Sequence, residues 1–82
     1  MKQFWHPDEL AHSWTLSGDE RALLANKTGA TRLAFAVLLK AFKCDGRFPE
    51  RREDVPHRVV VYLAHQVGVL PDVYAEVDWP GR

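Results

Sequence analysis

The middle of the chain carries a series of basic side chains whose charge and reach suit contact with phosphate groups. They are Lys27, Arg32, Lys43, Arg47, Arg51, Arg52 and Arg58. Arginine hydrogen-bonds phosphate oxygens through a planar, permanently charged guanidinium, and from a mobile loop it can also enter a minor groove. We therefore predict that these residues bind double-stranded DNA. The alternative is a solvated loop whose arginines pair with Glu50, Glu53 and Asp54.

Two of these residues, Lys27 and Arg32, lie where a long apolar helix is expected to begin. The unpaired N–H groups at a helix start attract anions, so this end could also receive a phosphate. Simple capping of the helix by Thr28 or Thr31 explains the same polar residues.

Residue types that perform catalysis or bind metals do not recur at the spacing such sites need. His6 and His12 are six residues apart, and His57 and His65 are eight apart, whereas a zinc-binding helix uses positions i and i+4. Cys44 follows an apolar stretch and is expected to pack there as a small side chain. The chain also lacks G-x-S-x-G, H-E-x-x-H and a glycine-rich phosphate loop. We expect no metal, no cofactor and no enzymatic activity.

Length and composition indicate one small domain over residues 1–82. Hydrophobic residues make up 46% of the 82 positions, and 11 basic residues balance 11 acidic ones. The bases concentrate between Arg32 and Arg58, so a polyanion is expected to meet the middle of the chain. A single cysteine fits a reducing cytoplasm. No stretch approaches the ~20 apolar residues of a membrane span, so no membrane contact is expected.

The elements that must position these residues are expected to be helices, which predicts an all-α fold: a small bundle of about five short helices. The expected ranges are Pro7–Ser13, Ser17–Ala25, Ala30–Lys43, Pro56–Val67 and Pro71–Val77. Ser17 and Glu20 form a capping box, S-x-x-E. Gly46 and Gly68 are expected to end helices in the left-handed conformation. A short strand over the β-favouring residues 59–62 is the competing interpretation.

The third helix is apolar around most of its girth, so we expect partners to bury it on several sides. One stripe contains Leu33, Ala36 and Val37, and another contains Phe35, Leu38, Leu39 and Phe42. The polar loop of residues 45–54 follows. We expect Phe48 to attach this loop to the core and Asp54 to cap the fourth helix.

The segment Leu63–Val77 matches a helix-turn-helix pattern, which predicts a helix-turn-helix-like C-terminal pair. Ala64 allows close packing four residues before Gly68, which turns the chain. An ordinary helical corner fits the same pattern. The last helix carries acids at Asp72 and Glu76, with Asp78 beyond it, and these repel phosphates. We therefore expect the basic middle to bind DNA and the last helix to act as scaffold or as a minor contact.

Four ordered motifs give the chain a family resemblance. They are T-L-S-x-x-E from Thr15, R-L-x-F-A-x-x-L-K from Arg32, G-R-F-P from Gly46 and V-x-Y-L-A-x-Q-V-G from Val60. In this order they resemble the extreme N-terminal domain of the replicative transposases of class II, Tn-three-like transposons. The likeness covers essentially the whole chain and is clearest over residues 14–82.

The resemblance implies a non-catalytic DNA-binding module that recognises the terminal inverted repeats of a transposon. The implied partners are double-stranded DNA and the remainder of a longer transposase chain, whose acidic, metal-dependent catalytic domain lies far downstream. This sequence offers no positions for those catalytic acids, and the resemblance assigns no base-reading residue. Zero net charge indicates weak affinity for the module alone, with tighter binding from linkage to further modules.

A helical module for protein–protein contact or dimerisation, without DNA contact, is the alternative function. Aromatic residues are abundant in this short chain, and Phe4, Trp5 and Trp79 could form an exposed patch that marks such an interface. DNA affinity and self-association distinguish the two hypotheses.

Overall fold

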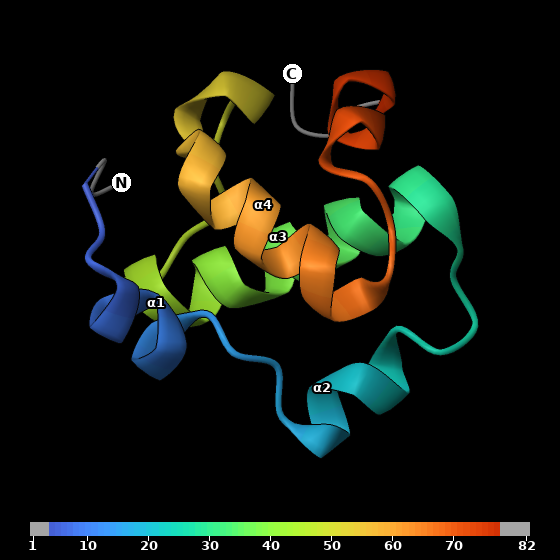
Figure 1. Ribbon diagram of the computed structural model, residues 1–82, viewed down its shortest axis with the longest axis horizontal. Helices are drawn as coiled ribbons and strands as arrows, with labels where there is room; N and C mark the ends of the chain where they lie inside the picture. The colour runs from blue at the N-terminus through green and yellow to red at the C-terminus, as the bar shows by residue number, and fades with distance from the viewer. Residues whose placement is uncertain (1–3, 78–82) are drawn as a thin grey trace.

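A computed structural model describes residues 4–77 of the chain, and within this range the backbone is helical without strands. The elements are α1 (Pro7–Ser13), α2 (Gly18–Leu23), α3 (Gly29–Asp45), the 3₁₀ helix η1 (Arg52–Asp54), α4 (His57–Val67) and the 3₁₀ helix η2 (Pro71–Glu76). In Figure 1, α4 crosses in front of α3, α1 lies at the lower left and α2 at the bottom, and η2 lies at the upper right, near the N-terminal end of α3. The all-α prediction is confirmed for this range.

The core forms mainly where α3 and α4 cross. Leu33 and Val37 of α3 and Val59 and Leu63 of α4 are fully buried, and Trp14 from the α1–α2 connection joins them. Such apolar burial is the main favourable term in folding a chain of this size. Residues 59–62 lie inside α4, so helical packing prevails over their β preference. Within residues 4–77, no helix combines the length and the apolar character that crossing a membrane requires.

The helix-end signals in the sequence operate as predicted. The Ser17 hydroxyl accepts from the Glu20 N–H at 3.2 Å, and the Glu20 carboxylate accepts from the Ser17 N–H at 2.8 Å, which completes the capping box. Gly46 and Gly68 follow α3 and α4 with φ of +78° and +76°. Only glycine adopts this conformation without strain, so both helices end at these positions.

The prediction that α3 is buried on several sides is wrong for one stripe of the helix. Phe35 and Phe42 remain 46% and 48% exposed, because α3 packs mainly against α4 and η2. Phe48 was expected to attach its loop to the core, but it is 56% exposed. Its ring stacks on Phe42, with centroids 4.9 Å apart. Within residues 4–77, no helix covers the side of α3 that carries Phe35 and Phe42.

Two details at the C-terminal half also differ from expectation. Asp54 does not cap α4; its carboxylate accepts from the Arg51 N–H at 3.2 Å in η1, and Pro56 occupies the N-cap position. The element that follows the Gly68 turn was expected to be an α-helix. It is a 3₁₀ helix of six residues, η2. Val73 and Tyr74 of η2 still pack on the core, as expected.

The N-terminal aromatic residues divide between surface and core. Phe4 is 66% exposed, whereas Trp5 packs against the core and meets Trp14 edge to face at 5.7 Å. Trp79, the third member of the expected patch, and Asp78 lie outside the described residues. Phe4 is therefore the exposed member of that patch within residues 4–77.

Candidate nucleic-acid interface

Two of the seven predicted DNA contacts, both arginines, form hydrogen bonds to backbone carbonyl groups inside the fold. Arg32 donates to the carbonyl oxygens of Lys27 at 2.7 Å and Val67 at 3.3 Å. The Arg52 guanidinium donates to the carbonyl oxygens of Ala75 at 3.1 Å and Val77 at 2.7 Å. Lys27 lies in the connector before α3, whereas Val67, Ala75 and Val77 lie at the C-terminal ends of α4 and η2, where carbonyl groups lack partners within the helix. Both arginines therefore join segments that are distant in sequence.

Two lysines of the predicted set are also engaged. The Lys43 ammonium lies 2.6 Å from the buried carboxylate of Glu20. The Lys27 ammonium lies over the Phe35 ring, 4.4 Å from its centroid, which is a cation–π contact. The Lys27 contact leaves the charge at the surface, so Lys27 can still attract an anion. Lys43 shares the single Glu20 carboxylate with Lys40, so its contact holds the side chain in place and cancels its charge only in part.

The remaining three residues extend into solvent. Arg47 has an 80% exposed side chain, with only a loose 3.7 Å contact to Asp45. Arg51 and Arg58 are exposed, and their guanidinium groups make no hydrogen bond or ion pair with residues 4–77. All three come from the loop and the first turn of α4. This segment supplies the three members of the predicted set that extend furthest into solvent.

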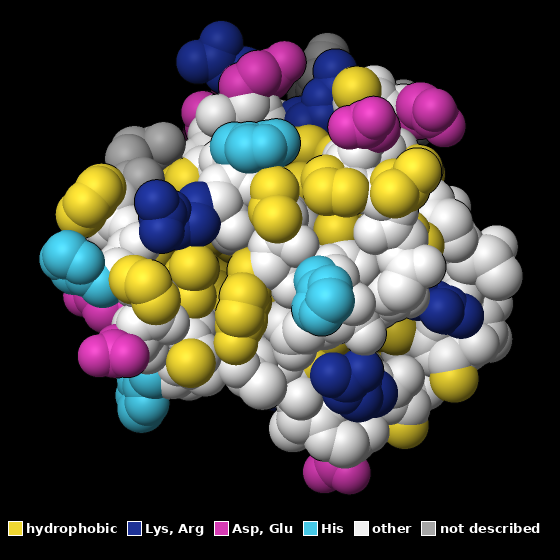
Figure 2. Space-filling view, in the orientation of Figure 1, with side chains coloured by type: hydrophobic (Ala, Val, Ile, Leu, Met, Phe, Trp, Pro, Cys, Tyr) yellow, Lys and Arg dark blue, Asp and Glu magenta, His cyan; other side chains and the backbone are white. Residues whose placement is uncertain are grey.

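Lys and Arg side chains form separate patches on the face that α4 presents, as Figure 2 shows. Histidine and hydrophobic side chains lie between these patches, and Asp and Glu side chains lie toward the rim of the view. The basic side chains on this face therefore do not build one continuous surface. Any polyanion must contact them at separate points.

The outward face of α4 is an additional candidate that the sequence interpretation missed. Its exposed residues are His57, Arg58, Val61 and His65, while the opposite face is buried in the core. The helix contains no Asp or Glu. The signal was present in the sequence, because the segment HRVVVYLAHQV combines a strict apolar stripe with polar residues that carry no negative charge.

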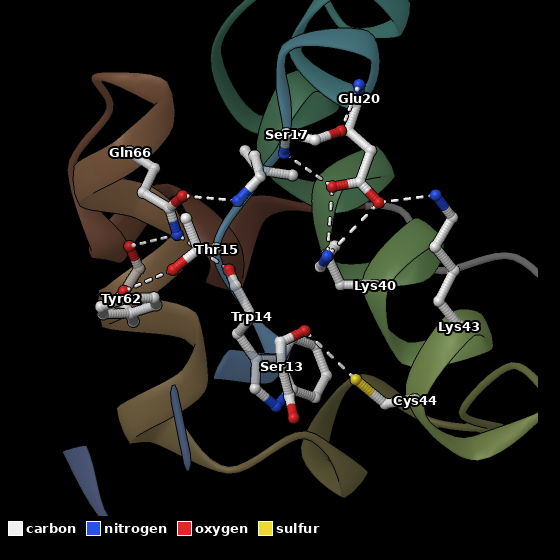
Figure 3. A network of polar contacts seen from close by, with 11 residues as sticks. Ser13, Trp14, Thr15, Ser17, Glu20, Lys40, Lys43, Cys44, Tyr62 and Gln66 are labelled. Atoms are coloured by element: carbon white, nitrogen blue, oxygen red, sulfur yellow. Dashed lines mark hydrogen bonds and ion pairs between the residues drawn. The ribbon is translucent and has the colours of Figure 1, made fainter. Parts of the chain in front are cut away.

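Glu20 forms the centre of a polar cluster between α2 and α3, shown in Figure 3. The Lys40 ammonium donates to its two carboxylate oxygens at 3.1 and 3.3 Å, and Lys43 adds the 2.6 Å contact. Burial alone raises the pKa of Glu20, but the hydrogen bonds from both lysines and the Ser17 N–H outweigh it and lower the pKa from 4.5 to about 2. The carboxylate is thus ionised and satisfied, which suits a structural role.

A second polar network centres on Gln66 of α4 (Figure 3). Its amide oxygen accepts from the Leu16 N–H at 2.8 Å, and its amide nitrogen donates to the Trp14 carbonyl at 2.9 Å. The Thr15 and Tyr62 hydroxyl groups meet beside it at 2.8 Å. These bonds fix the connection between α1 and α2 onto α4.

The two networks contain many of the residues that carried the family resemblance. Ser17 and Glu20 belong to T-L-S-x-x-E, Lys40 ends R-L-x-F-A-x-x-L-K, and Tyr62 and Gln66 belong to V-x-Y-L-A-x-Q-V-G. In this structure these residues join helices to one another. The motifs therefore specify the scaffold and leave the surface residues unassigned.

Catalytic and metal-binding arrangements are not found among residues 4–77. The His, Cys, Asp and Glu side chains of this range form no group that could hold a metal ion. The Cys44 thiol donates to the Ser13 carbonyl at 3.3 Å, and burial raises its pKa, which disfavours the nucleophilic thiolate. Cys44 is nevertheless exposed, contrary to its expected packing role, and its thiol joins the end of α3 to the end of α1.

Comparison with known proteins gives one family match. The model of a family described as a domain of unknown function, DUF4158, matches residues 1–79. No curated protein and no solved structure matches the chain.

Proposed function

We propose that this chain, which belongs to the DUF4158 family, is a DNA-binding module without catalytic activity of its own. In this proposal it is the N-terminal domain of a class II replicative transposase, acts in the cytoplasm and helps to recognise the terminal inverted repeats. Its partners are double-stranded DNA and the remainder of the transposase chain. The four ordered sequence motifs support the transposase assignment.

The observation that carries the DNA-binding proposal is the exposure of Arg47, Arg51 and Arg58 around the start of α4. A guanidinium group that is not engaged within the fold can donate two parallel hydrogen bonds to a phosphate at little structural cost. The expected affinity is modest, because few phosphates are neutralised.

Fluorescence anisotropy with a labelled duplex tests the proposal directly. The chain is titrated into a duplex that carries the terminal inverted repeat of its transposon, and into a mixed-sequence duplex, between about 50 and 200 mM salt. We expect binding at the lower salt that weakens as salt rises. Arg51→Ala and Arg58→Ala should each weaken binding to both duplexes and lower the salt slope by about 1.

A polypeptide extended beyond residue 82 provides the stricter test, because linked modules raise the affinity of weak ones. The absence of binding at low salt by this longer protein would reject the proposal. Glu50→Ala is a matched control, since it removes a nearby exposed side chain of opposite charge. It should leave binding unchanged or strengthen it slightly.

A protein-interaction module is the second candidate, and the uncovered stripe of α3 favours it. Phe35, Phe42 and Phe48 are each about half exposed, and the last two stack on each other. Large exposed apolar groups that lie together mark interfaces. Sedimentation over a range of concentrations tests this function. Self-association that Phe42→Ser abolishes, in a protein that ignores DNA, would favour it over DNA binding.

A further inference from the structure

We infer that α4 is the helix that enters the DNA, with its outward face in the major groove of a B-form duplex. This inference rests on the proposed DNA-binding function and adds the element, the groove and the residues. It differs from the helix-turn-helix expectation, in which the helix after the turn reads the bases. Here that position is taken by η2, a six-residue 3₁₀ helix with Asp72 in its first turn.

The outward face of α4 has the composition of a groove-reading surface. His57, Arg58, Val61 and His65 project from it, and their side chains make no hydrogen bond or ion pair with residues 4–77. Histidine can donate to or accept from base edges, and a valine methyl can contact the thymine methyl group. These side chains are available without breaking any contact of the fold.

The dimensions of α4 also suit the groove. Eleven residues give a helix of about 16 Å, and its diameter with side chains is about 10–12 Å. The major groove is about 12 Å wide, so it accepts one helix but not a pair. α4 lies at the surface, in front of α3 in Figure 1, and so can approach a duplex without rearrangement.

Cationic side chains lie at both ends of α4, where the phosphates that border the groove would lie. Arg58 is in the first turn. At the other end, Arg21 donates to the Gln66 carbonyl at 3.0 Å, and Arg32 donates to the Val67 carbonyl at 3.3 Å. A guanidinium carries five N–H donors, so the exposed Arg21 keeps donors for a phosphate. Phosphates near both ends of a helix that lies along the groove can therefore be contacted.

The placement of acids agrees with this orientation. α4 has no Asp or Glu, and the acids visible on its face of the molecule lie toward the rim in Figure 2. A duplex centred on the middle of α4 therefore meets histidine and apolar side chains first, while Glu53 and Asp72 line the hollow beside His57 at the start of the helix. A duplex centred on η2 would instead meet Asp72 and Glu76, which repel phosphates.

Methylation interference distinguishes the grooves without any change to the protein. Dimethyl sulfate modifies guanine N7 in the major groove and adenine N3 in the minor groove. The probe is the duplex that the chain selects from a randomised library. We expect methylation at guanine N7 to reduce binding. Interference confined to adenine N3 would overturn the assignment while leaving DNA binding intact.

Substitutions on α4 test which side chains read the bases. We expect Val61→Ala and His65→Ala each to lower affinity for the selected duplex by about fivefold or more. Affinity for mixed-sequence DNA should change little. The ratio of affinities for the selected and the mixed-sequence duplex should therefore fall. His12→Ala removes an exposed histidine from α1 and is the matched control, with no expected change. Circular dichroism confirms that each variant is folded.

The outcomes separate this inference from the proposed function. If the unmodified chain and its longer form bind no duplex, both ideas fail. If the chain selects a duplex but Val61→Ala and His65→Ala bind it like the unmodified protein, only the assignment to α4 fails. Loss of preference in these variants, with His12→Ala unaffected, supports both.

Discussion

Charged side chains have opposite fates in two regions of this molecule. Between α2 and α3, Glu20 is 3% exposed and Lys40 is 8% exposed, and their charges are paired. In the segment of residues 47–58, Arg47, Arg51 and Arg58 extend into solvent. The first region holds helices together, and the second is available to a partner.

The contrast shows that charge density along a sequence does not reveal which charges are available. Lys43 and Arg52 belong to the same basic series as Arg51, yet each bonds to a distant part of the chain. A buried charge must be paired to be tolerated, whereas an exposed charge costs little alone. Mutations between α2 and α3 should therefore lower stability, whereas mutations of the exposed arginines in residues 47–58 should weaken binding.

The largest effect is expected when the buried pair is broken. Glu20→Ala leaves the Lys40 ammonium buried without a partner and removes the bond that the Ser17 N–H donates to the Glu20 carboxylate in the capping box of α2. We expect a loss of about 3–5 kcal/mol in the free energy of unfolding, measured by urea denaturation. Glu53→Ala, which removes an exposed carboxylate, should cost about 0.5 kcal/mol or less.

If Glu20→Ala does not fold, the double variant Glu20→Leu, Lys40→Met keeps the test decisive. Replacement of a buried pair by apolar residues of similar size is often neutral, so the double variant should fold. A Glu20→Ala protein as stable as the original would show that Lys40 reaches water and that the pair is not needed.

A smaller loss is expected when the pair is weakened by acid. The pKa of Glu20 falls from 4.5 to about 2 in the fold, so the folded state binds its proton less readily than the unfolded state. This contribution to stability is complete above pH 4.5 and disappears as the pH falls toward 2. Urea midpoints measured across this range should decline less steeply for Glu20→Gln. Parallel declines in the two proteins would contradict the assigned pKa.

Next in size is the loss of the Gln66 network. Gln66→Ala leaves the Leu16 N–H and the Trp14 carbonyl without their partner, at an expected cost of about 2 kcal/mol in urea denaturation. His65→Ala, on the exposed side of the same helix, should cost no more than about 0.5 kcal/mol. Equal losses in the two variants would mean that water replaces the Gln66 amide.

The smallest effect separates two adjacent arginines. Arg52→Ala removes two hydrogen bonds to carbonyl groups near the end of η2 and should cost about 1 kcal/mol. Arg51→Ala should change the unfolding free energy by less than about 0.5 kcal/mol, yet weaken DNA binding. Thermal melting measures the stability of the two variants, and anisotropy measures their DNA binding. The comparison distinguishes an arginine that supports the fold from one that is free to bind DNA.

The parts of the fold that depend on neighbouring residues could be predicted from the sequence. Pro7 and the Ser17 capping box start helices, and Gly46 and Gly68 end them, because these signals act within one turn. The exposed state of Phe48 could not be predicted, because it depends on whether another element covers that side of α3. The 3₁₀ form of η2 likewise depends on how it packs against α3 and α4.

The candidate site was harder to predict, because contacts with residues far away in the sequence decide whether a charged side chain bonds within the fold or stays exposed. The residues next to Glu20 indicate only a role in helix capping. Its bonds to Lys40 and Lys43 join residues that are 20 and 23 positions apart in the sequence. Arg32 meets a carbonyl 35 residues away. Nothing in the sequence around these residues indicates the partner. That Arg51 and Arg58 are exposed while other basic residues bond within the fold is known only from the three-dimensional structure.

The position of Gln66 has a consequence for how the protein forms during synthesis. Its side chain meets Leu16 across 50 residues and Trp14 across 52. A nascent chain therefore exposes α1 and α2 to the ribosome surface long before the glutamine that fixes them has been translated. We expect the N-terminal third to acquire its stable arrangement only when α4 emerges, so that the order of maturation runs against the order of synthesis.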